Sequence, residues 1–505
     1  MKRATSIALT LLLGLALLWG ASGLHGPLLE ARRVYDLDHG EPLENAPPLI
    51  VFSTVALGGF SGVLADILWM RAAQLQQEGQ YFELVQLADW ITKLQPRFPE
   101  GWVYHAWNLT YNISAMFDRP ADRWRWVRQG LEMLRDGGIR YNPRHARLYW
   151  ELGWFFQHKL GSDTDRAHRY YQYEWAMEMQ RLFDGPRPDY AAMERVPAQR
   201  GALLQTPGMP ALIDALRTAG FDPFAYRWPE GDRYAEWLRI VAAHPAGAVL
   251  LDHWRLRIME DGYKLIPDRM RRIEEELGSL DWRMPQAHAI YWAWSGKPHA
   301  RDQAVQQFDR MIFQNMAAAF REGRFLHDPE TDRFLPSPNP DLLPYVLHAF
   351  EQAIATHDQP TMHVAYHNFM RQALAILYTT HRMDTARTLF ERLRQLQPEE
   401  VGLRDLDSYT IDVFVQDLTV LAPFEALAFV EGMLYQSYFW MALDDTARAT
   451  GYDRLATQAW HRYQASARAG RAPLSPLEEL RRTARDRVRE TLDGPQALQR
   501  LPADG

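Results

Sequence analysis

Two histidines of the chain have a spacing that can bind a metal ion. His363 and His367 are four residues apart in a segment expected to be helical, so their side chains share one face of the helix. A zinc site also needs a third protein ligand and polar groups that orient the ligands. His381 follows, but no pattern in the sequence places it beside the pair. We therefore expect these histidines to contact solvent or other side chains, and we predict no metal site.

Three acidic residues, Asp328, Glu330 and Asp332, alternate along the chain and carry the oxygen ligands that calcium prefers. A calcium loop needs further oxygen ligands at fixed positions and usually a glycine, which this segment does not supply. The first helical region contains three more histidines, for which we expect packing between helices or along a groove rather than proton transfer. They are His145, His158 and His168.

The sequence contains none of the short motifs that mark common active sites. It has no GxxxxGK[ST] phosphate loop, no HExxH and no GxSxG. Its carboxylates are scattered, so no acid/base pair can be assembled from the sequence. Cysteine is absent, which excludes disulfides, thiolate catalysis and lipid attachment through cysteine. We predict that the protein is not an enzyme, with no catalytic residues and no cofactor.

Tryptophan is abundant, with 18 copies in 505 residues. Large aromatic side chains fill the space between helices in helical repeats, and this is the simpler explanation of the count. The alternative is a glycan-binding groove lined by stacking rings. As tentative groove residues we select five aromatics, each of which faces either the core or the groove according to its helical phase. They are Trp102, Trp107, Tyr111, Trp150 and Trp154.

The segment that must position these aromatics is residues 148–176, which is predicted to form two amphipathic helices joined by a short turn. Tyr149, Leu152, Gly153 and Phe156 keep the spacing W-x2-L-G-x2-Y, with Tyr and Phe in the aromatic positions. Ala167 and Tyr171 then supply an A-x3-F pair. Small residues at these positions let two helices approach closely, and the aromatics fill the groove between neighbouring pairs.

The same pattern recurs along the chain. Trp102 lies one repeat length, about 34 residues, after Leu68 and opens the next predicted helix. Ala386, Phe390 and Pro398 belong to a further unit downstream. These residues resemble the tetratricopeptide repeat (TPR) family, in about a third of the chain. The segment around residues 81–136 also resembles a group of uncharacterised bacterial membrane-associated TPR proteins. The resemblance implies an all-α, TPR-like α-solenoid of helix pairs in the cell envelope, and it implies no chemistry.

Composition agrees with a folded protein and excludes one class of partner. Hydrophobic residues make up 47% of the chain and charged residues 24%, which is close to an ordinary globular protein. The net charge is −7 with both signs interspersed, so no basic field is present to hold nucleic acid. We therefore expect protein partners, with a glycan as the alternative.

The N-terminus has the features of an export signal. Lys2 and Arg3 precede an uncharged, mostly apolar run that ends at Leu24, so residues 1–24 are predicted to be a signal anchor or a cleaved signal peptide. The basic residues keep the N-terminus in the cytoplasm, which places the body outside it, as a membrane-anchored or a secreted periplasmic protein. A second uncharged run, 46–65, is either a cap on the first repeat or a second span, which would return the body to the cytoplasm.

The rest of the chain divides by composition. We predict a linker and apolar segment over 25–65 and TPR-like repeats over 66–184. A helical insertion, rich in Pro and Gly at its start, is predicted over 185–284. Degenerate TPR-like repeats follow over 285–468, with a Pro-rich loop at 325–345. A charged C-terminal helix and tail complete the chain over 469–505.

These observations favour a non-enzymatic scaffold of the bacterial cell envelope. Stacked helix pairs form a long rigid surface that can hold a partner protein or peptide, with aromatic and arginine side chains as anchors. The alternative is a helical envelope protein that binds or processes glycans. That protein would need two carboxylates facing one tryptophan-lined cleft, and a closed ring of helices would favour it over an open superhelix.

Overall fold

The computed structural model describes residues 61–197, 199–328, 333–415, 423–467, 473–492 and 500–502. These residues are mostly helical, and the strands among them form a single hairpin, which confirms the all-α prediction. In the described ranges, no helix combines the length and the hydropathy needed to cross a membrane. The predicted signal segment 1–24 and most of 25–65 lie outside these ranges.

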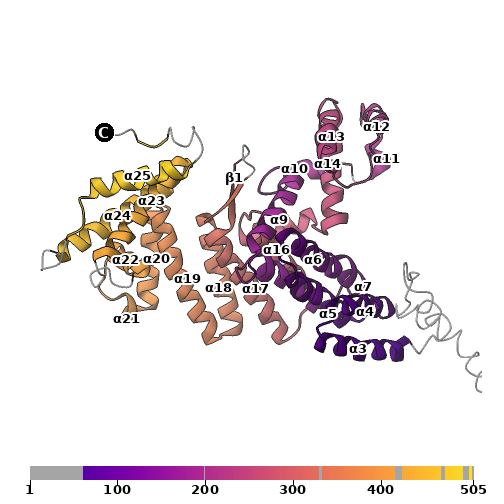
Figure 1. Ribbon diagram of the computed structural model, residues 1–505, viewed down its shortest axis with the longest axis horizontal. Coiled ribbons are helices and arrows are strands. Elements are labelled where there is room, and N and C mark those ends of the chain that lie inside the picture. Colours follow the sequence, from indigo (N-terminus) through magenta and orange to yellow (C-terminus); the bar gives the residue numbers. More distant parts are fainter. Residues whose placement is uncertain are drawn as a thin grey trace, which may run out of the picture.

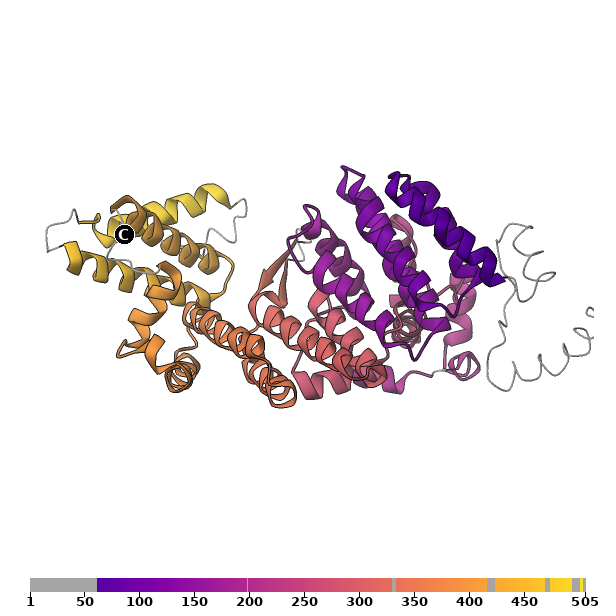
Figure 2. The same cartoon turned by 90° about the horizontal axis from the view of Figure 1, so that it is seen from below.

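The N-terminal helices pack in succession, and Figures 1 and 2 show them side by side. Three of them continue into a turn of π-helix, labelled η. The elements are α3 (Ser61–Gln77), α4 (Tyr81–Leu94), α5 (Pro99–Trp107), η2 (Asn108–Ile113), α6 (Pro120–Glu132), η3 (Met133–Gly138), α7 (Ile139–Tyr141), α8 (Ala146–Trp154), η4 (Phe155–Leu160) and α9 (His168–Phe183).

A second group of helices follows α9 and stands partly away from the row of the others (Figure 1). The elements are α10 (Tyr190–Arg195), α11 (Arg200–Leu203), α12 (Met209–Thr218), α13 (Asp232–Ala242), α14 (Gly247–Arg257), η5 (Ile258–Tyr263) and α15 (Pro267–Leu277). The chain then returns, and α16 (Pro285–Gly296) packs directly against α8. The segment between α9 and α16 is thus looped out of a continuous row of helices.

Glycines permit the close approach of α16 to α8. A Cβ atom on Gly153 of α8 would lie 2.7 Å from the sulfur of Met311 and 3.2 Å from the carbonyl oxygen of Ala289 in α16. A Cβ on Gly296, at the end of α16, would lie 2.4 Å from the Cβ of Tyr149. Any larger residue at either glycine would push the helices apart.

The C-terminal half continues the row and ends in a separate group of helices. Its elements are η6 (Lys297–His299), α17 (Gln303–Glu322), β1 (Arg324–Asp328), β2 (Arg333–Ser337), η7 (Pro340–Leu342), α18 (Leu343–His357), α19 (Pro360–Thr379), α20 (Met383–Leu396), α21 (Pro398–Val401), α22 (Leu406–Val415), α23 (Pro423–Ala442), α24 (Thr446–Ala467) and α25 (Leu477–Thr491). One hydrophobic core extends from Trp102 to Tyr409, and a second one lies mainly among α22 to α25. The row is open, with α3 and α25 at opposite ends of an arc (Figure 2).

The segment 325–345, predicted as a Pro-rich loop, instead contains a β-hairpin and the start of α18. Arg324 pairs with Ser337 and Asp328 pairs with Arg333 in an antiparallel register. The outer edge of β1 is covered, because the backbone N–H of Phe325 donates to Asp281 Oδ2 at 2.9 Å. Pro336 lies opposite Phe325 in β2 and has no N–H to offer to another strand. Pro336 therefore protects the edge of β2, in a segment that the sequence predicts to be a loop.

Two buried arginines hold this hairpin from opposite sides. Arg283, which precedes α16, is paired with Asp281 at 2.7 Å and donates from Nη2 to the Phe325 carbonyl at 2.9 Å. Arg448 of α24 donates to Ser337 Oγ at 2.8 Å. The hairpin therefore joins the central helices to the C-terminal group.

Candidate aromatic binding surface

Five aromatic side chains form a continuous strip across two neighbouring helices. Trp107 and Tyr111 come from α5 and η2, and Trp150, Trp154 and His158 come from α8 and η4. Within each helix the residues are four apart, so they lie on one face. We call these five residues the aromatic strip.

The rings of the aromatic strip stack on one another. The Trp150 and Trp154 rings are parallel to within 8° with centroids 5.5 Å apart, and the Trp154 and His158 centroids are 4.8 Å apart at 13°. Trp107 stacks on Tyr111 at 4.9 Å. The two helices are joined where Tyr111 Oη and His158 Nδ1 meet at 3.1 Å. Each ring of the strip is thus covered on at least one face by a neighbouring ring.

The aromatic strip lies at the surface over a closed core. Trp107 is 41% exposed, and the other four side chains are half-buried. Directly beneath, the buried ring of Phe155 meets Tyr111 edge-on, with centroids 5.6 Å apart. A row of half-exposed large aromatics is unusual on a free surface, since such residues are enriched at the centres of protein interfaces.

Two members of the aromatic strip lie in π-helical turns. Tyr111 is in η2 and His158 is in η4. A π-turn inserts one extra residue into the helical path and is common at functional sites. The paired turns bring the two side chains from adjacent helices into hydrogen-bond contact.

Trp102, the fifth predicted groove residue, belongs to the core and not to the surface. It is 7% exposed, and its indole N–H donates to the Pro96 carbonyl at 2.8 Å. Its ring lies so close to Gly137 that a Cβ there would come within 2.2 Å of it. Trp102 and Trp107 are five residues apart, so they point to different sides of α5, and a motif position alone does not reveal this.

A buried carboxylate lies beside the aromatic strip. Glu151 is 7% exposed, and its nearest cation is Arg147, at 3.6 Å. Burial raises the pKa of Glu151, while the charge of Arg147 opposes the change. Burial and the nearby Glu151 charge also raise the pKa of the Tyr111 hydroxyl. Tyr111 is therefore a neutral hydrogen-bonding group at physiological pH.

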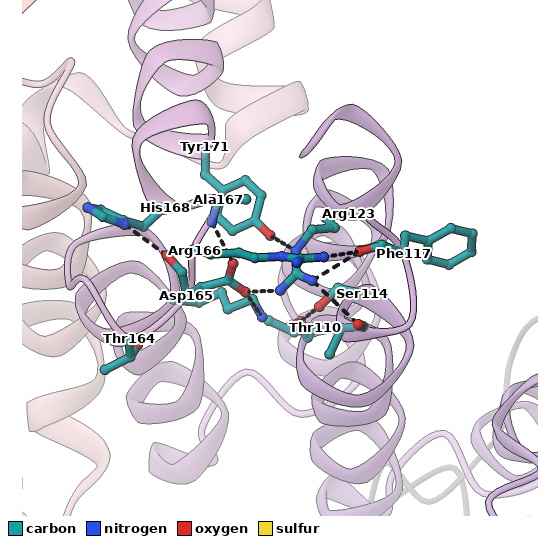
Figure 3. Close-up of polar contacts among 12 residues, drawn as sticks. Thr110, Ser114, Phe117, Arg123, Thr164, Asp165, Arg166, Ala167, His168 and Tyr171 are labelled. Carbon is teal, nitrogen blue, oxygen red and sulfur yellow. Dashed lines mark hydrogen bonds and ion pairs between the residues drawn. The ribbon is translucent and has the colours of Figure 1, made fainter. Parts of the chain in front are cut away.

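A charged cluster lies in the interior next to the strip, and Figure 3 shows its arrangement around Arg123 and Asp165. We define the charged cluster as Arg123 of α6, Lys159 of η4 and Asp165, which precedes α9. Asp165 Oδ2 lies 2.7 Å from Arg123 Nη2 and 2.6 Å from Lys159 Nζ, and all three side chains are at most 7% exposed. Asp165 Oδ1 accepts the backbone N–H of Ala167 at 2.8 Å.

The environment of the charged cluster shifts the pKa of all three members, and the shifts of Asp165 and Lys159 show the balance of burial against charge. Burial alone would raise the pKa of Asp165, but hydrogen bonds from Lys159, the Ala167 backbone and Arg123 outweigh it and lower the pKa to about 2. Burial lowers the pKa of Lys159, with Asp165 opposing the change. One carboxylate thus neutralises two buried cations in part, and its removal would leave both without a counter-charge.

The charged cluster fixes the helices that carry the aromatic strip. Lys159 follows His158, and its Nζ lies 5.0 Å from the centroid of the Tyr111 ring, a cation–π contact. Arg123 Nε donates to the Tyr171 hydroxyl at 3.1 Å, and Arg123 Nη1 donates to the Phe117 carbonyl just after η2 at 3.1 Å. The charged cluster thus joins α6, η4, α9 and the segment that follows η2 beside the strip.

Polar side chains of α17 contact η4 next to the aromatic strip. Gln157 of η4 donates to Gln314 Oε1 at 3.1 Å, which joins the two surfaces. Arg310, Gln314 and Arg321 lie on one face of α17, and we call them the polar stripe. Arg310 donates to Thr361 and Arg321 to Gln372, both at 3.3 Å, and neither arginine forms an ion pair within the described part of the chain.

The other sequence candidates do not assemble a site. His363 contacts Asp358 at 3.1 Å and His367 contacts the Gln397 amide at 2.8 Å. Among the described residues no three His, Asp or Glu side chains are grouped as a metal site would require. The side chains of Asp328, Glu330 and Asp332 lie outside the described residues.

Two of the remaining histidines lie at the beginnings of helices. His145 precedes α8, and His168 is the first residue of α9, with its Nδ1 2.8 Å from the Asp165 carbonyl. His158, by contrast, extends the series that begins at Trp150 and Trp154. The four-residue spacing of these three aromatics is the sequence signal that identifies it as part of the strip.

The comparisons with known proteins provide no relative from which a function could be transferred. No protein-family model matches the chain, and a search of curated proteins finds no similar sequence.

Proposed function

We propose that the protein is a non-enzymatic interaction scaffold that binds a partner protein or peptide along the aromatic strip. The observation that carries this proposal is the pre-organised row of half-exposed aromatic side chains on α5–η2 and α8–η4. Stacked Trp and Tyr rings offer large contact area, and because they are already fixed, little side-chain entropy is lost on binding.

The proposed architecture is a TPR-like α-solenoid in the cell envelope. Support comes from the succession of helix pairs, from the direct packing of α8 on α16, and from the close contacts of Gly153 in the Leu-Gly position of the repeat motif. The apolar N-terminal run supports membrane attachment with the body outside the cytoplasm. A second span over 46–65, with a cytoplasmic body, would leave the proposed binding role unchanged.

The geometry of the strip favours a protein over a glycan. A sugar stacks on the open face of an aromatic ring, whereas Trp154 is stacked between Trp150 and His158, and Trp107 has one face covered by Tyr111. The open arc of helices in Figure 2 also differs from the closed ring that would support a glycan-processing enzyme. Ring edges and half-buried indoles suit the apolar side chains of a partner protein.

The polar stripe suggests the charge of the partner segment. Arg310 and Arg321 lie on the same face of α17 as Gln314, which contacts η4, and they have no paired carboxylate in the described residues. A partner that places an apolar side chain on the strip and carboxylates over α17 would complete both surfaces. Raised salt should therefore weaken the complex through these two arginines.

The test is a pull-down of the tagged full-length protein from its native membranes in mild detergent, followed by mass spectrometry. It is run with the wild type, with a Trp150→Ala/Trp154→Ala variant, and with Tyr173→Ala as the matched control. Tyr173 is an aromatic on α9 with 39% exposure, outside the strip. A protein retained by the wild type and the control, but lost by the double variant, supports the proposal.

The same experiment can contradict the proposal. A partner that the double variant retains as well as the wild type would show that the strip is not the binding surface. If no protein copurifies with the wild type at all, the scaffold role loses its support. Binding of envelope polysaccharides, abolished in the double variant, would instead establish the glycan alternative.

A further inference from the structure

A cavity of about 300 Å³ lies between α15, η6, α17 and α18, remote in sequence from the aromatic strip. Its volume falls at the lower limit of small-molecule sites. Its walls combine five polar or charged side chains with five apolar ones. The lining residues are Glu276, Leu277, Lys297, Asp309, Ile312, Ala349, Gln352, Ala353, Ala355 and Thr356.

Asp309 is the most enclosed charged group at this cavity, with a side chain that is 12% exposed. Its Oδ1 lies 2.5 Å from Lys297 Nζ. Its Oδ2 lies 2.9 Å from His357 Nε2, and because a carboxylate only accepts, the imidazole N–H donates. Asp309 is therefore already paired with Lys297 and hydrogen-bonded to His357 in the cavity wall.

Glu276 gives the cavity a second carboxylate without a second cation. Its Oε2 accepts the indole N–H of Trp294 at 2.9 Å. No Lys or Arg of the described residues forms an ion pair with it, whereas the adjacent Glu275 pairs with Arg271 at 3.5 Å. The lining thus contains two carboxylates and one ammonium group, and Glu276, which is solvent-exposed at the rim, is the carboxylate that no Lys or Arg of the described residues neutralises.

The apolar walls limit the shape of a ligand. Ala349, Ala353 and Ala355 of α18 are small, and this leaves open the space that larger residues would fill. Leu277 and Ile312 complete an apolar surface next to the carboxylates. A short hydrocarbon stem could lie against this wall while its charged end reaches Glu276.

We infer that this cavity binds an organic cation, an ammonium or guanidinium group on a short apolar stem, with Glu276 as the charged anchor. The indole N–H of Trp294 donates to Glu276 Oε2 and helps to hold this carboxylate in place. The same chemistry is found in a free alkylamine and in the lysine side chain of a protein. This inference is independent of the proposed scaffold role, because its residues lie outside the aromatic strip and the polar stripe.

The test is isothermal titration calorimetry of the full-length protein with n-butylammonium, n-butanol and butyrate, at about pH 8, where imidazoles are neutral. The butylammonium ion is expected to bind with a Kd on the order of 1 mM, at least about tenfold tighter than the neutral alcohol or the anion. A parallel titration with the methylamide of N-acetyl-lysine separates the two sources. Binding of this peptide-like probe indicates that a protein side chain can enter, and its failure beside bound butylammonium indicates a free amine.

Two matched variants test whether the carboxylate of Glu276 binds the cation. Glu276→Gln keeps the acceptor for Trp294 and should weaken butylammonium binding about tenfold or more. Glu275→Gln removes the same charge from the neighbouring position and should leave binding unchanged. Equal binding of butanol and butylammonium, an absence of butylammonium binding, or equal effects of the two variants would overturn the inference. Circular dichroism of both variants excludes a loss of fold as the cause.

Discussion

The molecule contains two groups of tryptophans that use the same side chain for opposite purposes. In the looped-out segment, Trp237 and Trp254 are 0% and 1% exposed, with centroids 4.7 Å apart, and Trp228 packs against both. We call these three the insertion tryptophans. In the aromatic strip, the rings are stacked as closely, but they stand at the surface.

The difference lies in what surrounds the rings. The insertion tryptophans lie in the part of the main hydrophobic core that α12, α13 and α14 contribute, where the Trp254 indole N–H donates to the Pro223 carbonyl at 2.7 Å. The aromatic strip rests on a core that Phe155 and neighbouring residues already close. Tryptophan in the first group is enclosed by the core, while in the second it packs on the outside of the core and stays partly exposed.

The largest effect is expected from Trp237→Ala. Removal of this fully buried ring should lower the free energy of unfolding of its segment by about 4 kcal/mol, because it leaves a cavity in the hydrophobic core. Hydrogen exchange of α13 and α14 would measure the loss. Partner capture through the aromatic strip should persist, and its disappearance would show that the two groups are coupled.

A second prediction concerns the charged cluster that supports the strip. Asp165→Asn would leave Arg123 and Lys159 buried without a counter-charge, at a cost of about 3 kcal/mol. Hydrogen exchange should rise in η2, η4 and the start of α9 and stay unchanged around the insertion tryptophans. An equal rise of hydrogen exchange in both regions would show that the stabilities of the charged cluster and of the insertion tryptophans are not independent.

A third prediction concerns the loss of stability in acid that follows from the protonation of Asp165. Its pKa is lowered to about 2 in the folded protein, so its stabilising contribution is complete above its ordinary pKa, near pH 4, and is lost as pH falls through about 2. The expected loss is up to about 2 kcal/mol. Urea unfolding followed from about pH 5 downward should show a steeper decline in the wild type than in Asp165→Asn. Parallel curves would show that this carboxylate does not cause the decline.

The smallest effect on stability is expected from Trp154→Ala. Because its side chain is half-buried and its removal opens no closed cavity, the free energy of unfolding should fall by about 1 kcal/mol or less. Affinity for a partner captured through the strip should fall by about 2 kcal/mol or more. Chemical denaturation and calorimetry with the purified partner measure the two quantities. A stability loss as large as that of Trp237→Ala would assign Trp154 to the core.

The sequence predicts helices well here because their apolar periodicity is a local property. The close approach at Gly153 follows from its Leu-Gly motif, and the four-residue spacing of Trp150 and Trp154 places them on one face. The sequence leaves open whether Trp102 faces the core or the groove, because the motif fixes its helix but not the direction of its ring, and the structure places it in the core.

Other features depend on contacts between distant segments, which no local pattern contains. Asp165 lies in the polar turn GSDTD, and only the fold brings Arg123 and Lys159 to it. The hairpin was missed for a related reason. The Pro336 that suggests a loop is accommodated at a strand edge once Asp281 and Arg283 cover the other edge.

The hydrogen bonds from Arg283 and Arg448 to the hairpin have a consequence for the order in which the chain folds. Arg283 is synthesised before the hairpin, but Arg448 leaves the ribosome more than a hundred residues after Ser337, its partner at a sequence separation of 111. The Ser337 hydroxyl can therefore accept the hydrogen bond from Arg448 only after α24 has been synthesised. Since contacts between distant residues form late, we expect the joint between the central and C-terminal helices to close only near the end of synthesis.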